Sequence, residues 1–306
     1  MIVDKIQELM GNPDLDMPSI WLRYAKIAGA HAAQQLWADR EGYYEGPHAT
    51  NYCPSYGCKR KSAYKIHKVE GEPFQWRMFN TFGLGYCVEL FIKAQITELG
   101  IDFEDLRSFP LHWNLDGKPI MCSPDLYNVH LSDDPNYTYV VEIKSAASGS
   151  FDKVEREGIR SAYPHYFDQV QLEIAATGAH AGILVMENKN TAHLYEEVIE
   201  PDRLRLAELD KFFLDVHSGP PEQFERPFAL VERTLYHRGG TPPQTNRPLR
   251  EKFNKNGATI GWYEVLPEAD LPWNCGYCAW KHTCWAPATI TNVAGEGERP
   301  IWEVQQ

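Results

Sequence analysis

The chain has 306 residues, of which 43% are hydrophobic and 24% are charged. This length fits one large domain or two of ordinary size, and the composition excludes collagen-like, disordered and low-complexity proteins. The 42 acidic residues outnumber the 30 basic ones and give a net charge of −12, which argues against a protein held on nucleic acid by its overall charge. Residues 1–17 lack the pattern of an export signal, and no apolar stretch reaches the ~20 residues of a membrane span. We therefore expect a cytoplasmic protein without a membrane partner.

The hydrophobic periodicity predicts helices that alternate with pairs of strands, which indicates an α/β protein. Residues 219–258 are rich in turn residues and lack a clear period, so we expect a long loop or linker there. The predicted elements in chain order are helices within 1–46, a buried helix over 75–99, a β-hairpin over 118–145, a helix over 165–178 that ends at Gly178, two strands over 180–200 and an amphipathic helix over 201–219.

The predicted hairpin carries charged residues on apolar strands. We expect Asp125 on its first strand and Glu142 and Lys144 on its second. Side chains two residues apart on a strand point to the same face, so Glu142 and Lys144 project together, whereas Val141 and Ile143 face the opposite, apolar layer. Buried charges are costly unless they are paired or bound to metal. The alternative is an edge strand with solvated charges and a turn at Asp125.

Two carboxylates from neighbouring strands supply the hard oxygen ligands that Mg²⁺ or Mn²⁺ prefers. A lysine beside them can orient a metal-bound water or stabilise the charge that builds up on an attacked phosphate. The cluster therefore predicts hydrolysis of phosphodiester bonds.

The segments "SPDLYNV" at 123–129 and "VVEIKSA" at 140–146 resemble the D…E-x-K core of the PD-(D/E)XK nuclease superfamily. Their flanking segments follow the order found in RecB-like exonucleases. The resemblance implies a restriction-endonuclease-like core, with a mixed central sheet flanked by helices. It also implies that Glu89, Asp125 and Glu142 bind the metal, with the Ile143 carbonyl as a further ligand, and that Lys144 positions the attacking water. Many relatives have His where this chain has Glu89.

The family also has a glutamine on the helix that follows E-x-K. Gln169 matches it best, within "DQVQLEIAATG", a segment that is also similar to the phage lambda-type exonuclease motif. Gln171 is the second choice. The alternative for both residues is a polar helix face.

Three of the seven cysteines lie within ten residues, at Cys275, Cys278 and Cys284. Clustered thiols in a reducing compartment are most simply metal ligands, and three ligands require a fourth. For Cys87 and Cys122, which stand in apolar contexts, we expect ordinary burial.

The C-terminal triplet resembles that of CRISPR-associated RecB-like exonucleases and related helicase-nucleases. The resemblance implies a structural [4Fe–4S] cluster whose first ligand is Cys58, with Cys53 as an alternative ligand and Zn²⁺ as an alternative metal. Such a cluster would join the N- and C-terminal segments. It would hold a basic strip beside the nuclease core as a phosphate-binding surface; the strip consists of Lys59, Arg60, Lys61, Lys65 and Lys68.

We therefore expect a metal-dependent DNA exonuclease that acts on single strands or duplex ends, with a recombination or repair protein as a candidate partner. Two alternatives stay open: an endonuclease or CRISPR-type end processor that uses the same site, and a non-catalytic nucleic-acid-binding module stapled by its cysteine site. The expected regions are an N-terminal helical segment (1–50), the first cluster ligand with the basic strip (51–70), the nuclease core (71–218), a loop-rich linker (219–264), a C-terminal cysteine segment (265–290) and a tail (291–306).

Overall fold

The computed structural model describes residues 1–12, 14–17, 19–28, 49, 58–72, 76–131, 134, 136–226, 231–270, 275, 278–285, 289–291 and 301–303. The chain divides into two units. The first unit comprises Met1–Lys68 and Phe74–Pro221, and the second comprises Val69–Pro73 and Glu222–Gln306. Cys53 lies outside the described residues, as does most of the predicted helical segment beyond residue 28.

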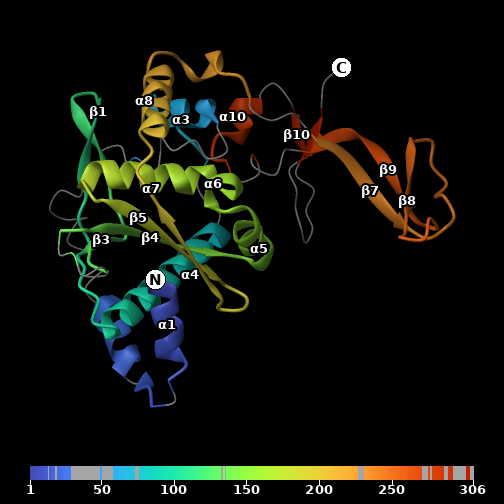
Figure 1. The fold of residues 1–306 in the computed structure, drawn as a ribbon. Coiled ribbons are helices and arrows are strands. Elements are labelled where there is room, and N and C mark those ends of the chain that lie inside the picture. Colours follow the sequence, from blue (N-terminus) through green and yellow to red (C-terminus); the bar gives the residue numbers. More distant parts are fainter. Residues whose placement is uncertain are drawn as a thin grey trace. The chain divides into compact units, whose positions relative to one another are not determined.

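A four-stranded sheet forms the centre of the first unit (Figure 1). Its strand order is β3 (Leu126–Val129), β4 (Tyr139–Ala146), β5 (Ala181–Asn188) and β6 (Leu194–Ile199). The inner strands β4 and β5 are parallel, whereas both outer pairs are antiparallel. The expectation of a mixed central sheet is therefore confirmed.

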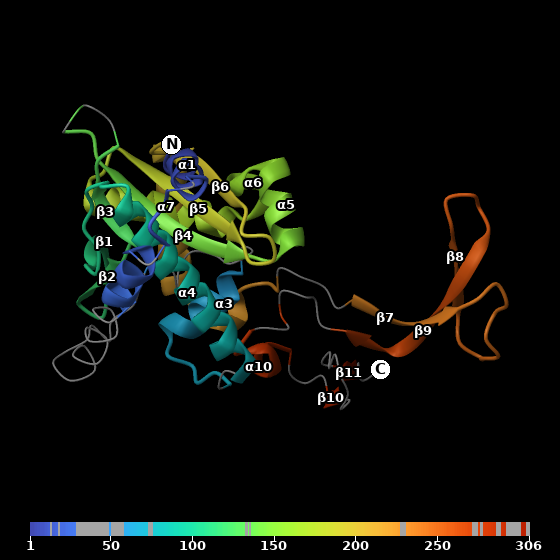
Figure 2. The same cartoon turned by 90° about the horizontal axis from the view of Figure 1, so that it is seen from below.

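Helices cover both faces of this sheet (Figure 2). The helices α1 (Ile2–Met10) and α4 (Trp76–Glu98) pack on one face, and α5 (Ser148–Glu157), α6 (Ile159–Ala162) and α7 (Pro164–Thr177) pack on the other. Because β4 and β5 are covered on both sides, their sequences are nearly continuous apolar runs rather than alternating ones. A charged residue inside such a run is therefore unusual.

Gly182 on β5 allows α7 to approach the sheet closely. A Cβ at this position would overlap Cγ1 of Val170 and would lie 3.2 Å from Cδ1 of Ile174, both on α7. Gly182 pairs with Val140 of β4, so the close approach occurs two residues before Glu142. This contact sets the height of α7 above the polar side chains of β4.

The predicted first strand of the hairpin is interrupted. Residues 118–122 form β2 (Lys118–Cys122), which pairs with β1 (Phe109–Leu115) in a separate two-stranded sheet, and only β3 pairs with β4. Asp125 was expected on a strand, but it lies in the bend directly before β3. Pro124 has no N–H to donate to a ladder, which favours a break at this point.

Two further helices of the first unit, α3 (Lys59–Ile66) and α8 (Arg203–His217), pack together. The helix α8 follows the predicted range closely, as does α7, which ends at Gly178 in the left-handed conformation. No element was predicted for residues 148–162, which form α5 and α6.

The second unit contains an antiparallel sheet where a loop-rich linker was expected. The strands β7 (Val231–Arg238) and β8 (Leu249–Phe253) both pair with β9 (Thr259–Asp270), and β9 also pairs with β11 (Ile301–Glu303), which pairs with β10 (Thr289–Thr291). The expectation for 219–258 is therefore wrong. Described side chains on both faces of β7 and β8 are exposed, so the sequence lacks the apolar alternation that reveals a half-buried strand.

The turn directly before the short helix α10 (Lys281–Trp285) holds residues 69–72 within the second unit. The Glu72 N–H donates to the carbonyl oxygen of Ala279 over 2.8 Å, and Trp280 Nε1 donates to the carbonyl oxygen of Val69 over 2.8 Å. The short 3-10 helix at Pro221–Gln223 spans the boundary between the units. Within the part of the chain that the structure describes, no helix has both the length and the apolar composition needed to cross a membrane.

Candidate active site

The charged residues of β4 share one face of the central sheet. Glu142 is only 2% exposed, and its Oε1 atom accepts a hydrogen bond from the Lys144 ammonium group. Val141 and Ile143 lie in the apolar cluster on the opposite face, with α1 and α4. The alternation of the strand therefore places Glu142 and Lys144 together, as predicted, on the face covered by α7.

Asp125 is held against β4 by the backbone. Its Oδ2 atom accepts a hydrogen bond from the Ile143 N–H over 2.7 Å. Burial raises the pKa of Asp125 well above its usual value, and the negative charges of Glu142 and Glu89 raise it further. The three carboxyl groups thus occupy one electrostatic environment, in which negative charge is in excess.

The same carboxyl groups favour the charged form of Lys144. Burial by itself lowers the pKa of Lys144, but the charges of Glu142 and Asp125 outweigh burial and raise this pKa above its ordinary value. The Lys144 Nζ atom also lies 5.2 Å from the centroid of the Tyr166 ring on α7. Lys144 therefore stays protonated among these groups.

Gln169 on α7 joins the cluster, and Gln171 does not. The Gln169 Nε2 atom donates to Glu142 Oε1 over 2.6 Å and to Glu173 Oε1 over 2.8 Å. Gln171 instead donates to the Glu200 carbonyl oxygen and accepts from the Asp202 N–H, each over 2.7 Å. Gln171 thus fastens the segment that enters α8.

Glu89 on α4 is paired with a lysine that sequence reasoning missed. The side chain of Lys93 is 2% exposed, and its Nζ lies 2.7 Å from Glu89 Oε1 and 3.6 Å from Asp105 Oδ2. Glu89 and Lys93 are one helical turn apart, which is the only sequence signal for this pair. Glu89 contributes to the raised pKa of Asp125, so it belongs to the same electrostatic environment.

Two further residues of α7 were missed. Glu173 is 1% exposed, and burial, followed by the charge of Glu142, raises its pKa well above the usual value. Burial also lowers the pKa of His165 to about 4, with smaller contributions from Lys144 and Lys61. Both residues lie one helical turn from Gln169, and this i±4 spacing is the signal that could have found them.

The donor set suits a divalent metal ion. Oε2 of Glu142 and Oε2 of Glu173 are buried and accept no hydrogen bond in the described structure. Carboxylate oxygens are the ligands that Mg²⁺ and Mn²⁺ prefer, and a divalent cation would offset the excess of negative charge. As the side chains lie, however, no three His, Cys, Asp or Glu residues among those described converge closely enough to hold a metal ion. The oxygens are directed instead to Lys144, Gln169, Lys93 and the Ile143 amide.

The basic strip on α3 does not form one row of similar cations. Lys59 pairs with Asp215 on α8 over 2.8 Å, and Lys68 pairs with Asp116 over 3.2 Å. Arg60 is buried, and its Nε donates to the Pro221 carbonyl oxygen over 3.1 Å. Lys61 differs from these because its charge, like that of Lys144, lowers the pKa of His165 on α7.

The four predicted cluster cysteines fall in different units. Cys58 precedes α3 in the first unit, whereas Cys275, Cys278 and Cys284 belong to the second, where the Cys278 N–H donates to the Cys275 carbonyl oxygen over 3.0 Å. Cys122 is buried, as expected. Cys87 is exposed, so that expectation was wrong: among the α4 side chains that the structure describes, the buried ones begin at Leu90, and Cys87 lies before them.

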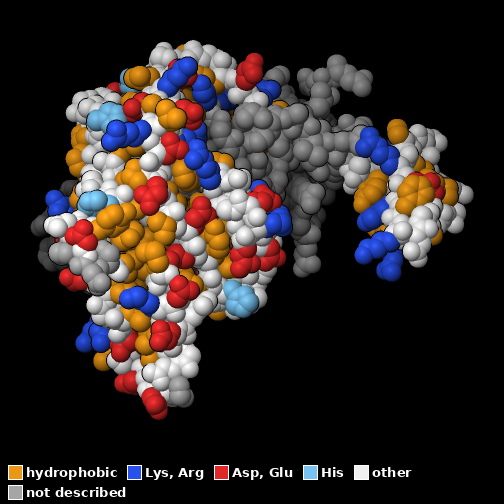
Figure 3. Space-filling view, viewed as in Figure 1, with side chains coloured by type: hydrophobic (Ala, Val, Ile, Leu, Met, Phe, Trp, Pro, Cys, Tyr) orange, Lys and Arg blue, Asp and Glu red, His pale blue; other side chains and the backbone are white. Residues whose placement is uncertain are grey.

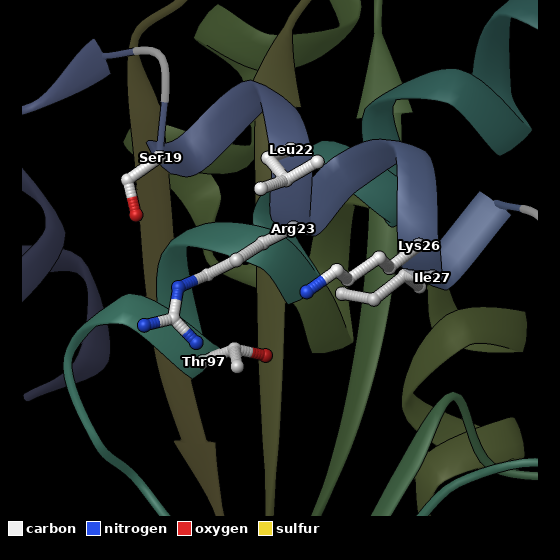
Figure 4. A pocket seen from close by; sticks show the side chains of 6 residues that line it. All are labelled: Ser19, Leu22, Arg23, Lys26, Ile27 and Thr97. Atoms are coloured by element: carbon white, nitrogen blue, oxygen red, sulfur yellow. The ribbon is translucent and has the colours of Figure 1, made fainter.

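A surface pocket in the first unit contains none of the predicted site residues (Figure 4). It lies between the helical residues 19–28 and the C-terminal end of α4, and its lining consists of Ser19, Leu22, Arg23, Lys26, Ile27 and Thr97. The candidate site is therefore a cluster of buried side chains beneath α7 and is separate from this pocket.

No protein-family model matches the sequence, and no curated protein matches it. Solved structures give weak likenesses. An alkaline exonuclease from Laribacter hongkongensis matches with 21% identity and a TM-score of 0.34 over 45% of this chain and 69% of its own. The structure of LHK-Exo with dAMP gives 17% identity and a TM-score of 0.40 over 55% and 87%, and the protein SSO0001 gives 17% and 0.39 over 66% and 88%. All three TM-scores lie below 0.5, so a functional assignment has to rest on the side chains of the site.

Proposed function

We propose that this chain is a metal-dependent DNA nuclease of the PD-(D/E)XK type that works as an exonuclease on single strands or duplex ends. One observation carries the proposal. On β4, the buried Glu142 binds the ammonium group of Lys144, with Asp125 fastened to the backbone between them. A carboxylate pair can hold a divalent metal ion, and an adjacent ammonium group can stabilise the charge that develops during phosphodiester hydrolysis.

In this proposal each residue has a separate role. Asp125, Glu142 and Glu89 would hold Mg²⁺ or Mn²⁺, together with the carbonyl of Ile143. When bound, the metal would polarise the phosphate and lower the pKa of a bound water. Lys144, which stays protonated, would orient the attacking water and stabilise the negative charge that develops on the phosphate.

The polar side chains around this group would keep it in place. Gln169 holds one oxygen of Glu142 and leaves the other oxygen available. A donor that fixes a metal-binding carboxylate in this way orients the ligand, as outer-shell contacts generally do in metal sites. Lys61, whose charge reaches His165, would meet a phosphate of the bound strand.

The proposal is tested by cleavage of labelled linear single-stranded and duplex DNA with Mg²⁺ or Mn²⁺. Lys144→Ala and Asp125→Asn should each lower the rate at least ~100-fold, because the first removes the ammonium group that stabilises the developing charge and the second removes a proposed metal ligand. Lys118→Ala, which changes an exposed lysine on β2, is the matched control and should cleave like the parent. Circular dichroism should show that the variants keep their helices and strands.

The outcome also separates the rival functions. Cleavage of covalently closed circular DNA would favour the endonuclease, which uses the same residues. Tight binding without cleavage by the parent, in either metal, would favour the non-catalytic module. Full activity of Lys144→Ala would remove the proposed catalytic assignment.

We further propose that Cys58, Cys275, Cys278 and Cys284 bind a [4Fe–4S] cluster, with Zn²⁺ as the alternative metal. The chain that follows α3 supports this proposal, since Val69 and Glu72 are hydrogen-bonded to the segment between Cys278 and Cys284. Val69 is 11 residues after Cys58 in the sequence. The cluster would close a loop of more than 200 residues and would therefore stabilise the fold.

A further inference from the structure

One face of the β7–β9–β8 sheet in the second unit carries aromatic and basic side chains, although the chain as a whole is acidic. Residues that lie directly opposite one another on paired antiparallel strands share a face, and so do residues two apart on one strand. The register of the three strands places two such rows next to each other. These rows are Tyr236–Tyr263–Arg250 and Arg238–Gly261–Lys252, and we call them together the tyrosine–cation face.

Gly261 allows the ring of Tyr236 to lie across the backbone of β9. A Cβ at position 261 would overlap the ring and hydroxyl group of Tyr236, so a larger residue there would displace the ring. The hydroxyl group donates to the Ile260 carbonyl oxygen over 3.1 Å, which fixes the far end of the ring. Tyr236 is nevertheless 41% exposed. An aromatic ring that is fixed against a sheet and open to solvent can stack on a planar ligand.

Positive charge accompanies these rings. The Lys252 Nζ atom lies 4.7 Å from the centroid of Tyr236 and 5.5 Å from that of Tyr263, and the two ring centroids are 5.2 Å apart. Arg238 and Arg250 are exposed at the ends of the rows. The two rows contain no acidic residue, whereas the opposite face carries Glu264, which binds His237 and Arg247. Figure 3 shows Lys and Arg side chains beside hydrophobic ones on this sheet.

We propose that the tyrosine–cation face binds a single strand of nucleic acid, with a base stacked on Tyr236 and phosphates near Arg238, Arg250 and Lys252. The net charge of the whole chain, −12, opposes a phosphate backbone, so binding depends on a local cationic surface. Stacking requires the open face of a base, which a single strand presents and a duplex conceals. The inference rests on the proposed function only for the choice of DNA as the polymer.

Binding can be measured separately from cleavage. The full chain carrying Lys144→Ala is titrated, without added divalent metal, against fluorescein-labelled oligothymidine of roughly 15 nucleotides, and fluorescence anisotropy is read. Tyr236→Ala should weaken binding about tenfold, or ~1.4 kcal/mol, because it removes the stacking of one base on the ring. Arg238→Ala with Lys252→Ala should reduce the slope of log K against log salt by about 1.4, or about 0.7 for each lost phosphate contact.

Three control variants and one competitor make the result specific. Tyr236→Phe keeps the ring and should bind like the parent, which separates the loss of stacking from misfolding of the sheet. Leu235→Ala changes the neighbouring exposed side chain on the opposite face, and Lys118→Ala removes a positive charge in the first unit; neither should change the affinity. Duplex DNA of the same length should compete weakly.

The inference is overturned if Tyr236→Ala and Arg238→Ala/Lys252→Ala both bind oligothymidine within twofold of the parent. It is also overturned if the parent does not bind oligothymidine at all, since the face would then fit an acidic protein better. The binding assay does not depend on cleavage, because the Lys144→Ala protein is used throughout. Failure of the proposed catalytic function would appear only in the cleavage assay, and failure of the tyrosine–cation face only in the binding assay.

Discussion

The side-chain amide of Gln169 on α7 lies 2.6 Å from Oε1 of Glu142 on β4, although 27 residues separate the two along the chain. The same nitrogen reaches Oε1 of Glu173 over 2.8 Å. One amide group thus lies between two buried carboxyl groups. It orients the carboxylate that we propose as a metal ligand, and it does so from a helix whose height above the sheet depends on Gly182.

Substitution of Gln169 should therefore affect catalysis more than stability. We expect Gln169→Ala to lower the rate of DNA cleavage 10- to 100-fold, about the loss that follows removal of an outer-shell contact in metal sites. Single-turnover cleavage with saturating Mg²⁺ or Mn²⁺ measures this effect. The apparent affinity for the metal should fall along with the rate.

Gln171 provides the matched control, because it lies two residues away on the same helix and is completely buried. Gln171→Ala leaves the Asp202 N–H and the Glu200 carbonyl oxygen without this partner. We expect a loss of about 1–3 kcal/mol in the free energy of unfolding, with little change in the cleavage rate of the folded protein. A larger catalytic loss in Gln171→Ala than in Gln169→Ala would contradict the proposed role of Gln169.

This pair also shows where sequence reasoning succeeds and where it ends. The 3.6-residue period and Gly178 define α7 well, and the alternation of β4 places Glu142 and Lys144 on one face. Which glutamine reaches Glu142 depends on the rotation and height of α7. Those are set by the packing of Val170 and Ile174 over Gly182, a contact between segments that no local pattern reveals.

The missed features have similar causes. Asp125 was expected on a strand because the apolar residues on both sides of it read as one run, whereas Pro124 divides that run between two sheets. The strand β7 was missed because described side chains on both of its faces are exposed, so its residues do not alternate between apolar and polar. Lys93 lies in the helix that was predicted from its apolar residues, and no role was predicted for it. Its ammonium group can be buried because Glu89 and Asp105 lie beside it.

Glu173 should make the stability of the metal-free protein depend on pH. A carboxyl group whose pKa is higher in the folded state than in the unfolded state contributes stability that is full below the unfolded pKa. This contribution is lost as the pH rises through the folded pKa. Because burial and Glu142 raise the pKa of Glu173, its charge should destabilise the fold at neutral and alkaline pH.

Glu173→Gln keeps the shape of the side chain and removes this titration. Urea unfolding with a chelator, at about pH 5 and about pH 8, should show that the variant is more stable than the parent at the higher pH, by more than about 1 kcal/mol. The two proteins should differ less at the lower pH. Glu155→Gln changes an exposed carboxyl group on α5 and should follow the parent at both values. An equal effect of both substitutions would show that Glu173 is not the titrating group.

The cysteine cofactor makes a separate prediction. Protein purified without oxygen should show the broad visible absorption of an iron–sulfur cluster, and Cys278→Ser should lose both the absorption and the bound iron. Cys87→Ser is the control, because Cys87 is exposed on α4 and lies outside the proposed ligand set. A colourless parent that contains zinc by elemental analysis would favour the Zn²⁺ alternative. A parent with neither metal would remove the proposed cluster.

Gly182→Ala tests whether the height of α7 controls the site. The added Cβ would overlap Val170, so α7 must move or the contact must be strained, and we expect a loss of about 1–3 kcal/mol in the free energy of unfolding. Because Gln169 is on the same helix, a shift of α7 should also lengthen its contact with Glu142 and lower the cleavage rate. Gly149→Ala, whose Cβ would meet nothing within 4 Å, should change stability by no more than about 0.5 kcal/mol and leave the rate unchanged. If Gly182→Ala destabilises the fold while cleavage by the folded protein stays at the parent's rate, the link between the packing of α7 and the position of Gln169 is wrong.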